Sequence, residues 1–271
     1  MACAGSDRLG LRRGVAVPLD TQVGTPVAPP QLTCRRVLFA GVLLATGACA
    51  VQPTKPDPSA AFITVTTQPA NVGDAKIAAL AYHDDGEYDR DLVTVAGKAA
   101  EWVNDRAGKV AKPALILDID ETSLSNWEVL KRDDFGRPVP GPCAPGLDTP
   151  CGWAAWDLLG RDPAIAPTLR LFNQARSLNV TVFFITGRPE NQRIATERNL
   201  VEAGYGGFAK AYFVPDGAHF TTAVDFKAPI RAQIEQMGYT IIANVGDQPS
   251  DLIGGHAEKM FLLPDPFYRV L

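Results

Sequence analysis

The stretch that decides the fold is Leu115-Ile116-Leu117-Asp118-Ile119-Asp120-Glu121-Thr122, an apolar run that ends in two aspartates one residue apart. Such a run is typical of a buried strand, and side chains along a strand alternate between its two faces. Asp118 and Asp120 are therefore predicted to lie on the same side, with Ile119 facing away. Two close carboxylates repel each other, which favours either a bound cation or a shifted proton affinity. The end of this strand is the first candidate for a functional site.

The composition indicates a globular chain without a nucleic-acid-binding face. The chain has 271 residues, of which 46% are hydrophobic and 21% are charged. This is enough for one good-sized domain. The formal net charge is −4, and the predicted folded part has no basic block. Because nucleic-acid binding requires concentrated Lys and Arg, we expect small-molecule rather than nucleic-acid partners.

The N-terminal region, residues 1–49, has the features of an upstream extension followed by an export signal. Arg35 and Arg36 precede a short apolar run over residues 37–44, and small residues follow up to Cys49. The run is too short for a membrane-spanning helix of about 20 residues, so it indicates a signal segment. Cys49 is then a candidate for lipidation, which would be the chain's only contact with a membrane. Secretion without an anchor is the alternative, and the paired arginines also admit twin-arginine export.

Residues 50–73 are rich in proline and small residues, which predicts a tether ahead of a folded domain over residues 74–271. Two cysteines, Cys143 and Cys151, lie within that domain, on either side of a turn-rich segment. In an oxidising compartment a disulfide between them is the simplest interpretation, and two unpaired thiols are the alternative. No His or second Cys pair has the spacing that a zinc site needs.

Helical and strand-like segments alternate along the predicted domain. Its first helix has one apolar face at spacings of three and four, formed by Tyr88, Leu92, Val95, Ala99 and Trp102. Further helices are expected over residues 122–130, 167–178, 190–203 and 226–237, and further strands over residues 180–185, 211–214 and 239–245. This alternation predicts an α/β fold, with a mostly parallel, Rossmann-like sheet and helices on both faces.

Polar residues follow the predicted strands, where sheets of this kind bind their ligands. The residues in these positions are Asp118, Asp120, Thr186, Gly187, Lys227, Asp247 and Asp251. Because the carboxyl ends of parallel strands meet at one edge of the sheet, we expect these side chains to form a single site. Lys210 is an alternative to Lys227 as its basic residue. Arg188 either contacts the substrate or pairs with an acidic neighbour, and the sequence does not decide between these roles.

Three motifs resemble those of the haloacid dehalogenase (HAD) superfamily of phosphotransferases. They are Asp-x-Asp-x-Thr at residues 118–122, Thr-Gly-Arg-Pro-Glu at residues 186–190 and Gly-Asp-Gln-Pro-Ser-Asp-Leu at residues 246–252. With the ending Leu-Pro-Asp-Pro-Phe-Tyr at residues 263–268, they are similar to acid phosphatases of subfamily IIIB. That subfamily includes plant vegetative storage proteins and bacterial lipoprotein acid phosphatases. The resemblance covers roughly residues 74–271 and implies a HAD fold with a small insertion between the first two motifs.

The resemblance also assigns roles to the site residues. Asp118 would attack phosphorus and form an aspartyl-phosphate, while Asp120 would protonate the leaving alcohol and then activate water. Mg²⁺ is the implied ion, because hard oxygen ligands suit it. Its implied ligands are the side chains of Asp118 and Asp247, the backbone carbonyl of Asp120, and Asp251 through water or as an orienting group. The residues implied to bind phosphate are Thr186, Gly187 and Lys227.

The predicted function is therefore that of a magnesium-dependent acid phosphatase acting on small phosphomonoesters. Two alternatives stay open. One is a storage or binding protein that keeps the fold with little catalysis, and the other is a phosphotransferase that passes phosphate to an acceptor alcohol. Trp127, Trp153 and Trp156 are either a flat face for an aromatic group of the substrate or simply part of the packing of the insertion. The sequence does not predict an oligomeric state.

Overall fold

The computed structural model of the chain describes residues 69–139 and 152–270. The predicted export signal with Cys49, nearly all of the predicted tether, and both Cys143 and Cys151 lie outside these described residues. Within the two described ranges, no helix is both long enough and apolar enough to cross a membrane.

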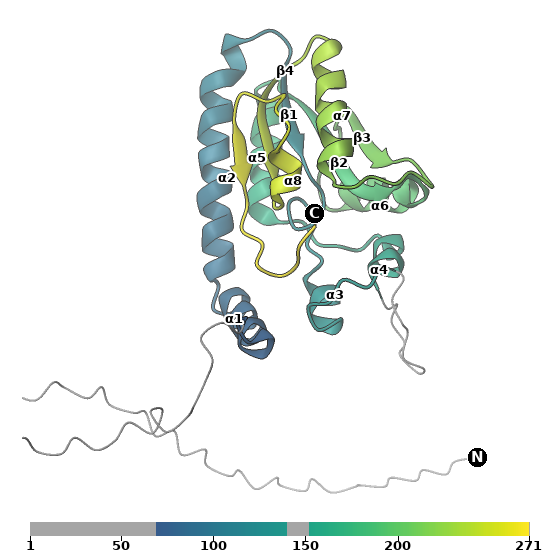
Figure 1. The fold of residues 1–271 in the computed structure, drawn as a ribbon. Helices are drawn as coiled ribbons and strands as arrows, with labels where there is room; N and C mark the ends of the chain where they lie inside the picture. The colour runs from purple at the N-terminus through teal and green to yellow at the C-terminus, as the bar shows by residue number, and fades with distance from the viewer. Residues whose placement is uncertain (1–68, 140–151, 271) are drawn as a thin grey trace, which may run out of the picture. The chain divides into compact units, whose positions relative to one another are not determined.

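A five-stranded sheet forms the centre of the domain (Figure 1). Its strands are β1 (Pro113–Leu117), β2 (Thr181–Pro189), β3 (Lys210–Val214), β4 (Thr240–Gly246) and β5 (Met260–Leu262). They lie in the order β3-β2-β1-β4-β5, and every neighbouring pair is parallel. The predicted parallel α/β fold is confirmed. β1 is the central strand, so the loop that follows it reaches the middle of the sheet's carboxyl edge.

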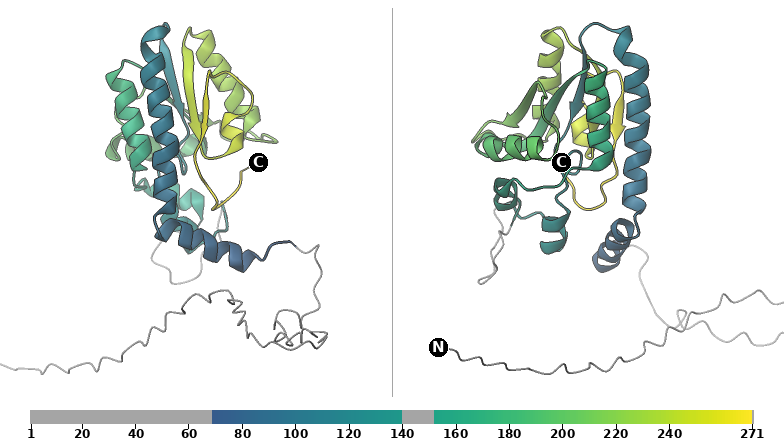
Figure 2. Two further views of the ribbon diagram at one scale, coloured as in Figure 1. Left: turned by 90° about the vertical axis from the view of Figure 1, so that its left-hand side faces the viewer. Right: turned by 180° about the vertical axis from the view of Figure 1, so that it is seen from behind.

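Helices lie on both faces of the sheet and beyond the carboxyl ends of its strands. They are α1 (Val72–Asp84), α2 (Glu87–Arg106), α3 (Trp127–Arg132), α4 (Trp153–Leu159), α5 (Ala166–Ser177), α6 (Arg193–Glu202), α7 (Val224–Gln236) and α8 (Pro249–Leu252). Helices α2 and α5 lie on one face and α7 lies on the other (Figure 2). Helices α3 and α4, which belong to the predicted small insertion between β1 and β2, lie beyond the carboxyl ends of the strands (Figure 1).

The core consists of two apolar layers, one on each side of the sheet. In β1, Leu115 and Leu117 belong to the layer under α2 and α5, while Ala114 and Ile116 belong to the layer under α7. All four are 2% exposed or less. Burial of a leucine or isoleucine contributes about 1.5–3 kcal/mol, so burial on both sides fixes the register of β1 and the position of the loop after it.

The predicted helix over residues 122–130 is wrong in its first half, because residues 122–126 are not helical and α3 begins at Trp127. The carbonyl of Ile119 accepts hydrogen bonds from the backbone N–H groups of residues 122, 123 and 124, and Glu121 has a φ of 47°. The chain therefore curls tightly after β1. Helix α1 begins at Val72, two residues before the predicted start of the folded domain, because the Asn71 side chain accepts from the N–H groups of residues 73 and 74. Helix α4 and strand β5 were not predicted.

Candidate active site

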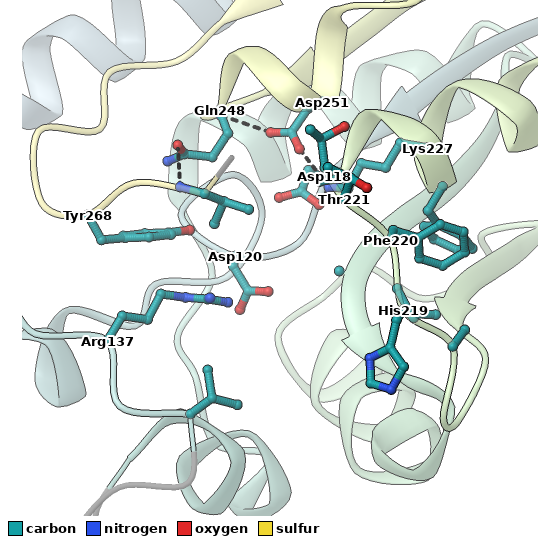
Figure 3. Close-up of a pocket in the computed structure, with 18 residues that line it drawn as sticks. Asp118, Asp120, Arg137, His219, Phe220, Thr221, Lys227, Gln248, Asp251 and Tyr268 are labelled. Atoms are coloured by element: carbon teal, nitrogen blue, oxygen red, sulfur yellow. Dashed lines mark hydrogen bonds and ion pairs between the residues drawn. The ribbon is translucent and has the colours of Figure 1, made fainter.

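A pocket of about 580 Å³ opens at the carboxyl ends of the strands (Figure 3). Asp118 and Asp120 reach it from the loop after β1, Gly187 from β2, Lys227 from α7 and Asp251 from α8. Four segments that are far apart in the sequence therefore meet at one edge of the sheet, as parallel topology requires. Both aspartates of the opening stretch line this pocket, as expected, although β1 ends at Leu117 and they lie in the loop that follows it.

A buried lysine links two carboxylates at the bottom of the site. Lys227 Nζ lies 2.5 Å from Asp118 Oδ1 and 2.6 Å from Asp251 Oδ1, and all three side chains are buried. Burial alone would lower the pKa of Lys227, but the two carboxylates outweigh it and raise that pKa, so the ammonium group stays charged. Lys210, the alternative, instead has its Nζ 4.5 Å from the centre of the Tyr212 ring. The structure thus places Lys227 at Asp118.

Asp251 serves the local fold and the site at once. Its Oδ2 accepts from the backbone N–H of Gln248 at 2.8 Å and so caps α8, while its Oδ1 faces Lys227. A Cβ added at Gly246 would overlap the Asp251 side chain, so a glycine is needed where β4 ends. The helix-capping role and the position beside Lys227 therefore belong to one carboxylate.

Asp247 is held by neutral donors. Thr122 Oγ1 donates to its Oδ1 at 2.9 Å, and Gln248 Nε2 and the Tyr268 hydroxyl donate to its Oδ2 at 2.8 and 3.3 Å. Burial, followed by repulsion from Asp251 and Asp118, raises the pKa of Asp247 well above its ordinary value. The threonine of the first motif thus positions an aspartate of the last motif.

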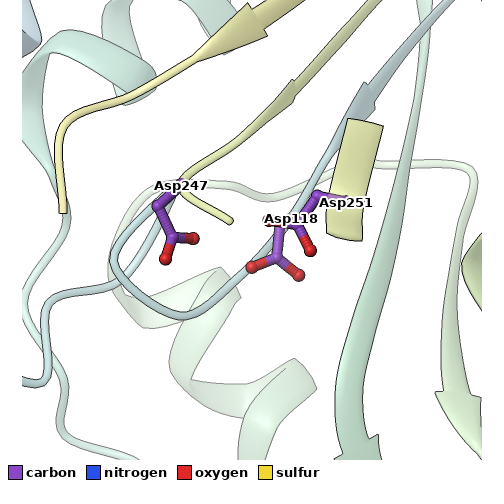
Figure 4. A group of neighbouring side chains, drawn as sticks. All are labelled: Asp118, Asp247 and Asp251. Atoms are coloured by element: carbon purple, nitrogen blue, oxygen red, sulfur yellow. The ribbon is translucent and has the colours of Figure 1, made fainter. Parts of the chain in front are cut away.

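Three buried carboxylates form a candidate metal site. Asp118, Asp247 and Asp251 each offer an oxygen, and these oxygens lie within 4.8 Å of one another (Figure 4). Burial, together with repulsion from Asp251 and Asp120, raises the pKa of Asp118 to about 7 in spite of Lys227. Lys227 alone therefore does not compensate the negative charge of the ionised Asp118 carboxylate. Hard oxygen donors in this number fit a divalent cation, which would offset that charge.

Asp120 occupies the same pocket but has other partners. Arg188 Nη2 donates to Asp120 Oδ1 at 2.7 Å, and Asn126 Nδ2 donates to the same oxygen at 2.9 Å. Burial alone would raise the pKa of Asp120, but Arg188 and then Asn126 outweigh it and hold that pKa below its ordinary value. The pKa values of Asp118 and Asp120 are therefore shifted in opposite directions, although the two residues are only two positions apart.

Arg188 is the centre of a buried network. Of the two roles that the sequence left open for it, the structure shows pairing with acidic neighbours. Its Nη2 also lies 3.0 Å from Asp162 Oδ2 and 3.3 Å from Asp157 Oδ1, and its Nη1 donates to Thr196 Oγ1 at 3.2 Å. Burial is the main cause that raises the pKa of Asp157 to about 7 and that of Asp162 to about 6. Arg188 thus pairs with three acidic neighbours.

The two residues of the second motif that were predicted to bind phosphate, Thr186 and Gly187, differ in their access to the pocket. Gly187 is exposed and lines the pocket, whereas Thr186 is fully buried and does not. The Thr186 hydroxyl accepts from the backbone N–H of Arg188 at 3.0 Å. It therefore supports the irregular part of β2 between Ile185 and Pro189, and its own proton is left for another acceptor.

The three tryptophans of the insertion pack within the protein. Trp153 and Trp156 are 2% and 1% exposed, and the Trp127 ring stacks on His83 with 3.6 Å between ring centres. None of the three lines the pocket. Their role as a flat face for a substrate is therefore not supported, and the packing interpretation accounts for them.

Sequence reasoning missed several residues that line the pocket. His219 and Phe220 come from the loop between β3 and α7, Tyr268 from the C-terminal segment, and Arg137 from the insertion. A signal was available for the first two, because that loop follows a strand at the carboxyl edge of a parallel sheet. For Arg137 the sequence offered no comparable signal, because it lies ahead of a long loop whose path the pattern does not predict.

Comparisons with known proteins agree with this geometry. A family model described as HAD superfamily, subfamily IIIB (acid phosphatase) matches residues 44–271. The chain is 32% identical over 179 residues to acid phosphatase 1 of Solanum lycopersicum, which covers 62% of this chain and 67% of that protein. It is 32% identical over 162 residues to a stem 28 kDa glycoprotein of Glycine max, covering 59% and 61%. The class C acid phosphatase structure from Bacillus anthracis has a similar fold, with a TM-score of 0.57 at 20% identity over 72% of this chain and 85% of that one.

Replacement of Arg188 by glutamine should lower the free energy of unfolding by about 3–5 kcal/mol, because three buried carboxylates would lose their shared cation. Urea unfolding at neutral pH measures the loss. Arg198→Gln, at an exposed arginine of α6, is the matched control and should cost less than about 0.5 kcal/mol. The loss should shrink when Asp157→Asn and Asp162→Asn are added. A loss below about 1 kcal/mol for Arg188→Gln alone would contradict the buried-charge explanation.

In a metal-free buffer, the free energy of unfolding should fall as the pH rises from about 5 to about 8. The pKa of Asp118 is raised from 3.8 to about 7 by folding, so the folded state binds more protons than the unfolded state in this range. Stability is then present at acid pH and is lost as Asp118 ionises, by an amount on the order of 2–4 kcal/mol. Thermal unfolding with a chelator at several pH values measures this, and Asp118→Asn should make the fall shallower, with the remaining slope due to Asp157 and Asp162, whose pKa values are also raised. A wild-type profile that rises over the same range would show that the carboxylates do not repel as described.

Proposed function

The chain belongs to subfamily IIIB of the HAD superfamily, the acid phosphatases, and we propose that it hydrolyses small phosphomonoesters with Mg²⁺ as its metal ion and Asp118 as its nucleophile. The family and the tomato acid phosphatase indicate a phosphomonoesterase. Proteins of this superfamily generally use a divalent metal ion, and the buried aspartate cluster fits one. The observation that carries the proposal is the contact of Asp118 with Lys227 beside Asp247 and Asp251.

Asp118 has the surroundings of a nucleophile. Its Oδ1 accepts from Lys227, and its carboxylate faces the pocket, where a phosphomonoester would enter. Attack forms a bond between the carboxylate and phosphorus and breaks the ester bond, which releases the alcohol and leaves an aspartyl-phosphate. Attack of water on phosphorus then frees phosphate and restores Asp118. Lys227, which stays charged, would stabilise the phosphoryl oxygens during both steps.

Asp120 has the surroundings of a general acid and base. Arg188 and Asn126 fix its carboxylate at the pocket, so its position does not depend on the substrate. Protonated, it would donate to the oxygen of the leaving alcohol; ionised, it would take a proton from the attacking water. Because Arg188 favours the ionised form, the first role requires acid pH and the second does not.

The metal ion would be held by the side chains of Asp118 and Asp247 and the backbone carbonyl of Asp120. Asp251 is already bound to Lys227 and to the N–H of Gln248, which favours an orienting role for it over direct ligation. When bound, Mg²⁺ supplies positive charge that offsets the carboxylates and the phosphate dianion. The amide of Gly187 at the pocket wall would complete the phosphate site, and the buried Thr186 hydroxyl would support it by holding the backbone N–H of Arg188.

The alternatives differ in how this site would behave. A storage protein with the same fold would not need a buried nucleophile linked to a lysine, and the contact of Asp118 with Lys227 therefore favours catalysis. A phosphotransferase would use the same residues and differ only in the acceptor. Export through the segment over residues 35–49, with lipidation at Cys49 or secretion, and a disulfide between Cys143 and Cys151 complete the proposal; they rest on the sequence.

Asp118→Asn should lower the hydrolysis of para-nitrophenyl phosphate by at least about 10³-fold, because the variant lacks the nucleophile. A chelator should abolish wild-type activity, and added Mg²⁺ should restore it. Asp105→Asn, at an exposed aspartate of α2, is the matched control and should stay within about twofold of wild type. Activity that survives both Asp118→Asn and chelation would contradict the nucleophile and the metal together.

Asp120→Asn should impair an alkyl phosphate far more than para-nitrophenyl phosphate. An alkoxide needs a proton to leave, whereas para-nitrophenolate does not, so general acid catalysis worth about 10²–10⁴-fold is lost only for the alkyl ester in the first step. Steady-state rates for glycerol phosphate and para-nitrophenyl phosphate measure the difference. Equal losses for the two substrates would argue against Asp120 as the acid. Product analysis with added alcohol would reveal transfer instead of hydrolysis.

A further inference from the structure

The pocket contains an arginine whose guanidinium has no ion-pair partner among the residues that the structure describes. Arg137 lines the pocket and is exposed, and within residues 69–139 and 152–270 its guanidinium makes no ion pair. The other basic side chains on the pocket wall differ from it. Lys227 is already bound to two carboxylates, and His219 lies on the opposite wall (Figure 3). Among the described residues, Arg137 is therefore a pocket cation without an ion-pair partner of its own.

Ring contacts hold this guanidinium in place, and its N–H groups make no hydrogen bond to any other described residue. It lies 4.8 Å from the ring centre of the buried Trp153 and 5.5 Å from that of Tyr268. The backbone beside it is also fixed, because the carbonyls of Pro138 and Val139 accept from the N–H groups of Trp153 and Ala154 in the first turn of α4. An arginine that stacks on aromatic rings keeps its N–H groups available for an anion.

The position of Arg137 indicates which part of a substrate it would meet. Its guanidinium points toward Asp120, whereas Lys227 lies on the far side, next to Asp118 (Figure 3). Its charge contributes to the lowered pKa of Asp120, which agrees with this proximity. In the proposed reaction Asp118 and Lys227 hold the phosphoryl group and Asp120 faces the leaving oxygen. Arg137 therefore lies on the side of the leaving group.

On the basis of the proposed phosphomonoesterase function, we propose that Arg137 binds a second anionic group on the alcohol part of the substrate. The preferred substrates are then phosphomonoesters whose alcohol also carries a carboxylate or a second phosphate. A guanidinium binds either anion with two parallel hydrogen bonds. The pocket, at about 580 Å³, has room for a compact group beyond the phosphoryl group.

Two substrates that differ in one group provide the test. Glycerol 3-phosphate and 3-phosphoglycerate differ only in a hydroxymethyl group against a carboxylate. Wild type should have a kcat/KM about tenfold higher for 3-phosphoglycerate, and Arg137→Gln should remove this preference with less than about threefold change for glycerol 3-phosphate. Because Arg137 is exposed, the preference should also weaken at high salt. Propane-1,3-diol bisphosphate against 3-hydroxypropyl phosphate tests the second phosphate in the same way.

Arg161→Gln is the matched control. Arg161 also stacks on a tryptophan of α4, with 5.0 Å to the ring centre of Trp156, but it does not line the pocket. This variant should keep the wild-type preference, and Arg137→Lys should keep part of it. Thermal unfolding of each variant shows whether the fold is retained.

Three results would overturn the proposal. Equal losses on both substrates in Arg137→Gln would assign Arg137 to the phosphoryl group, and wild type without a preference would show that no second anion is bound. Calorimetric binding to the Asp118→Asn protein decides the question without turnover, since 3-phosphoglycerate should bind about tenfold more tightly than glycerol 3-phosphate and equal binding would refute the proposal. Failure of wild type to hydrolyse either ester would instead refute the proposed function, which the binding experiment distinguishes.

Discussion

Charge compensation between buried carboxylates and two buried cations is the constraint on which the site depends. Lys227 joins Asp118 to Asp251, and Arg188 joins Asp120 to the carboxylates of the insertion. An ionised carboxylate without such a partner would be costly in this interior. Burial raises the pKa of both aspartates of the opening stretch, but Arg188 and Asn126 outweigh it at Asp120, whereas Lys227 does not at Asp118, so the pKa of Asp118 is raised and that of Asp120 is lowered. Two identical side chains thereby acquire two different proton affinities, and a bound divalent cation would be needed to hold Asp118, the proposed nucleophile, in its ionised form.

The parallel sheet makes this compensation available. β1 is the central strand, so its neighbours β2 and β4 deliver Arg188 and Asp247 to either side of the loop after β1. Local details then fix the loop. The carbonyl of Ile119 accepts three backbone hydrogen bonds, and Thr122 holds Asp247 at 2.9 Å. The last residue of the opening stretch thus connects two strand ends, and its hydroxyl is as much a part of the site as the carboxylates are.

The sequence was sufficient for the α/β class and for the placement of the polar residues at one edge, because strand and helix periodicity are local and parallel topology does the rest. It was insufficient where the decisive contact is between distant segments. The tight loop after β1 was predicted as helix because residues 122–130 contain helix-compatible residues, whereas the Ile119 carbonyl decides their conformation. The partners of Arg188 could not be predicted either, since Asp157 and Asp162 become its neighbours only once the insertion has folded back.

One face of α4 connects the two arginines on either side of Asp120. Trp153 and Asp157 are four residues apart, so they lie on the same face of this helix. The ring of Trp153 supports the guanidinium of Arg137, and Asp157 Oδ1 lies 3.3 Å from Nη2 of the Arg188 guanidinium. The difference between the partners explains the difference between the cations. An arginine paired with carboxylates is neutralised and holds the protein together, whereas an arginine supported by rings keeps its charge for a ligand. The small insertion therefore provides a wall of the pocket that fixes Asp120 through one guanidinium and presents the other to the substrate.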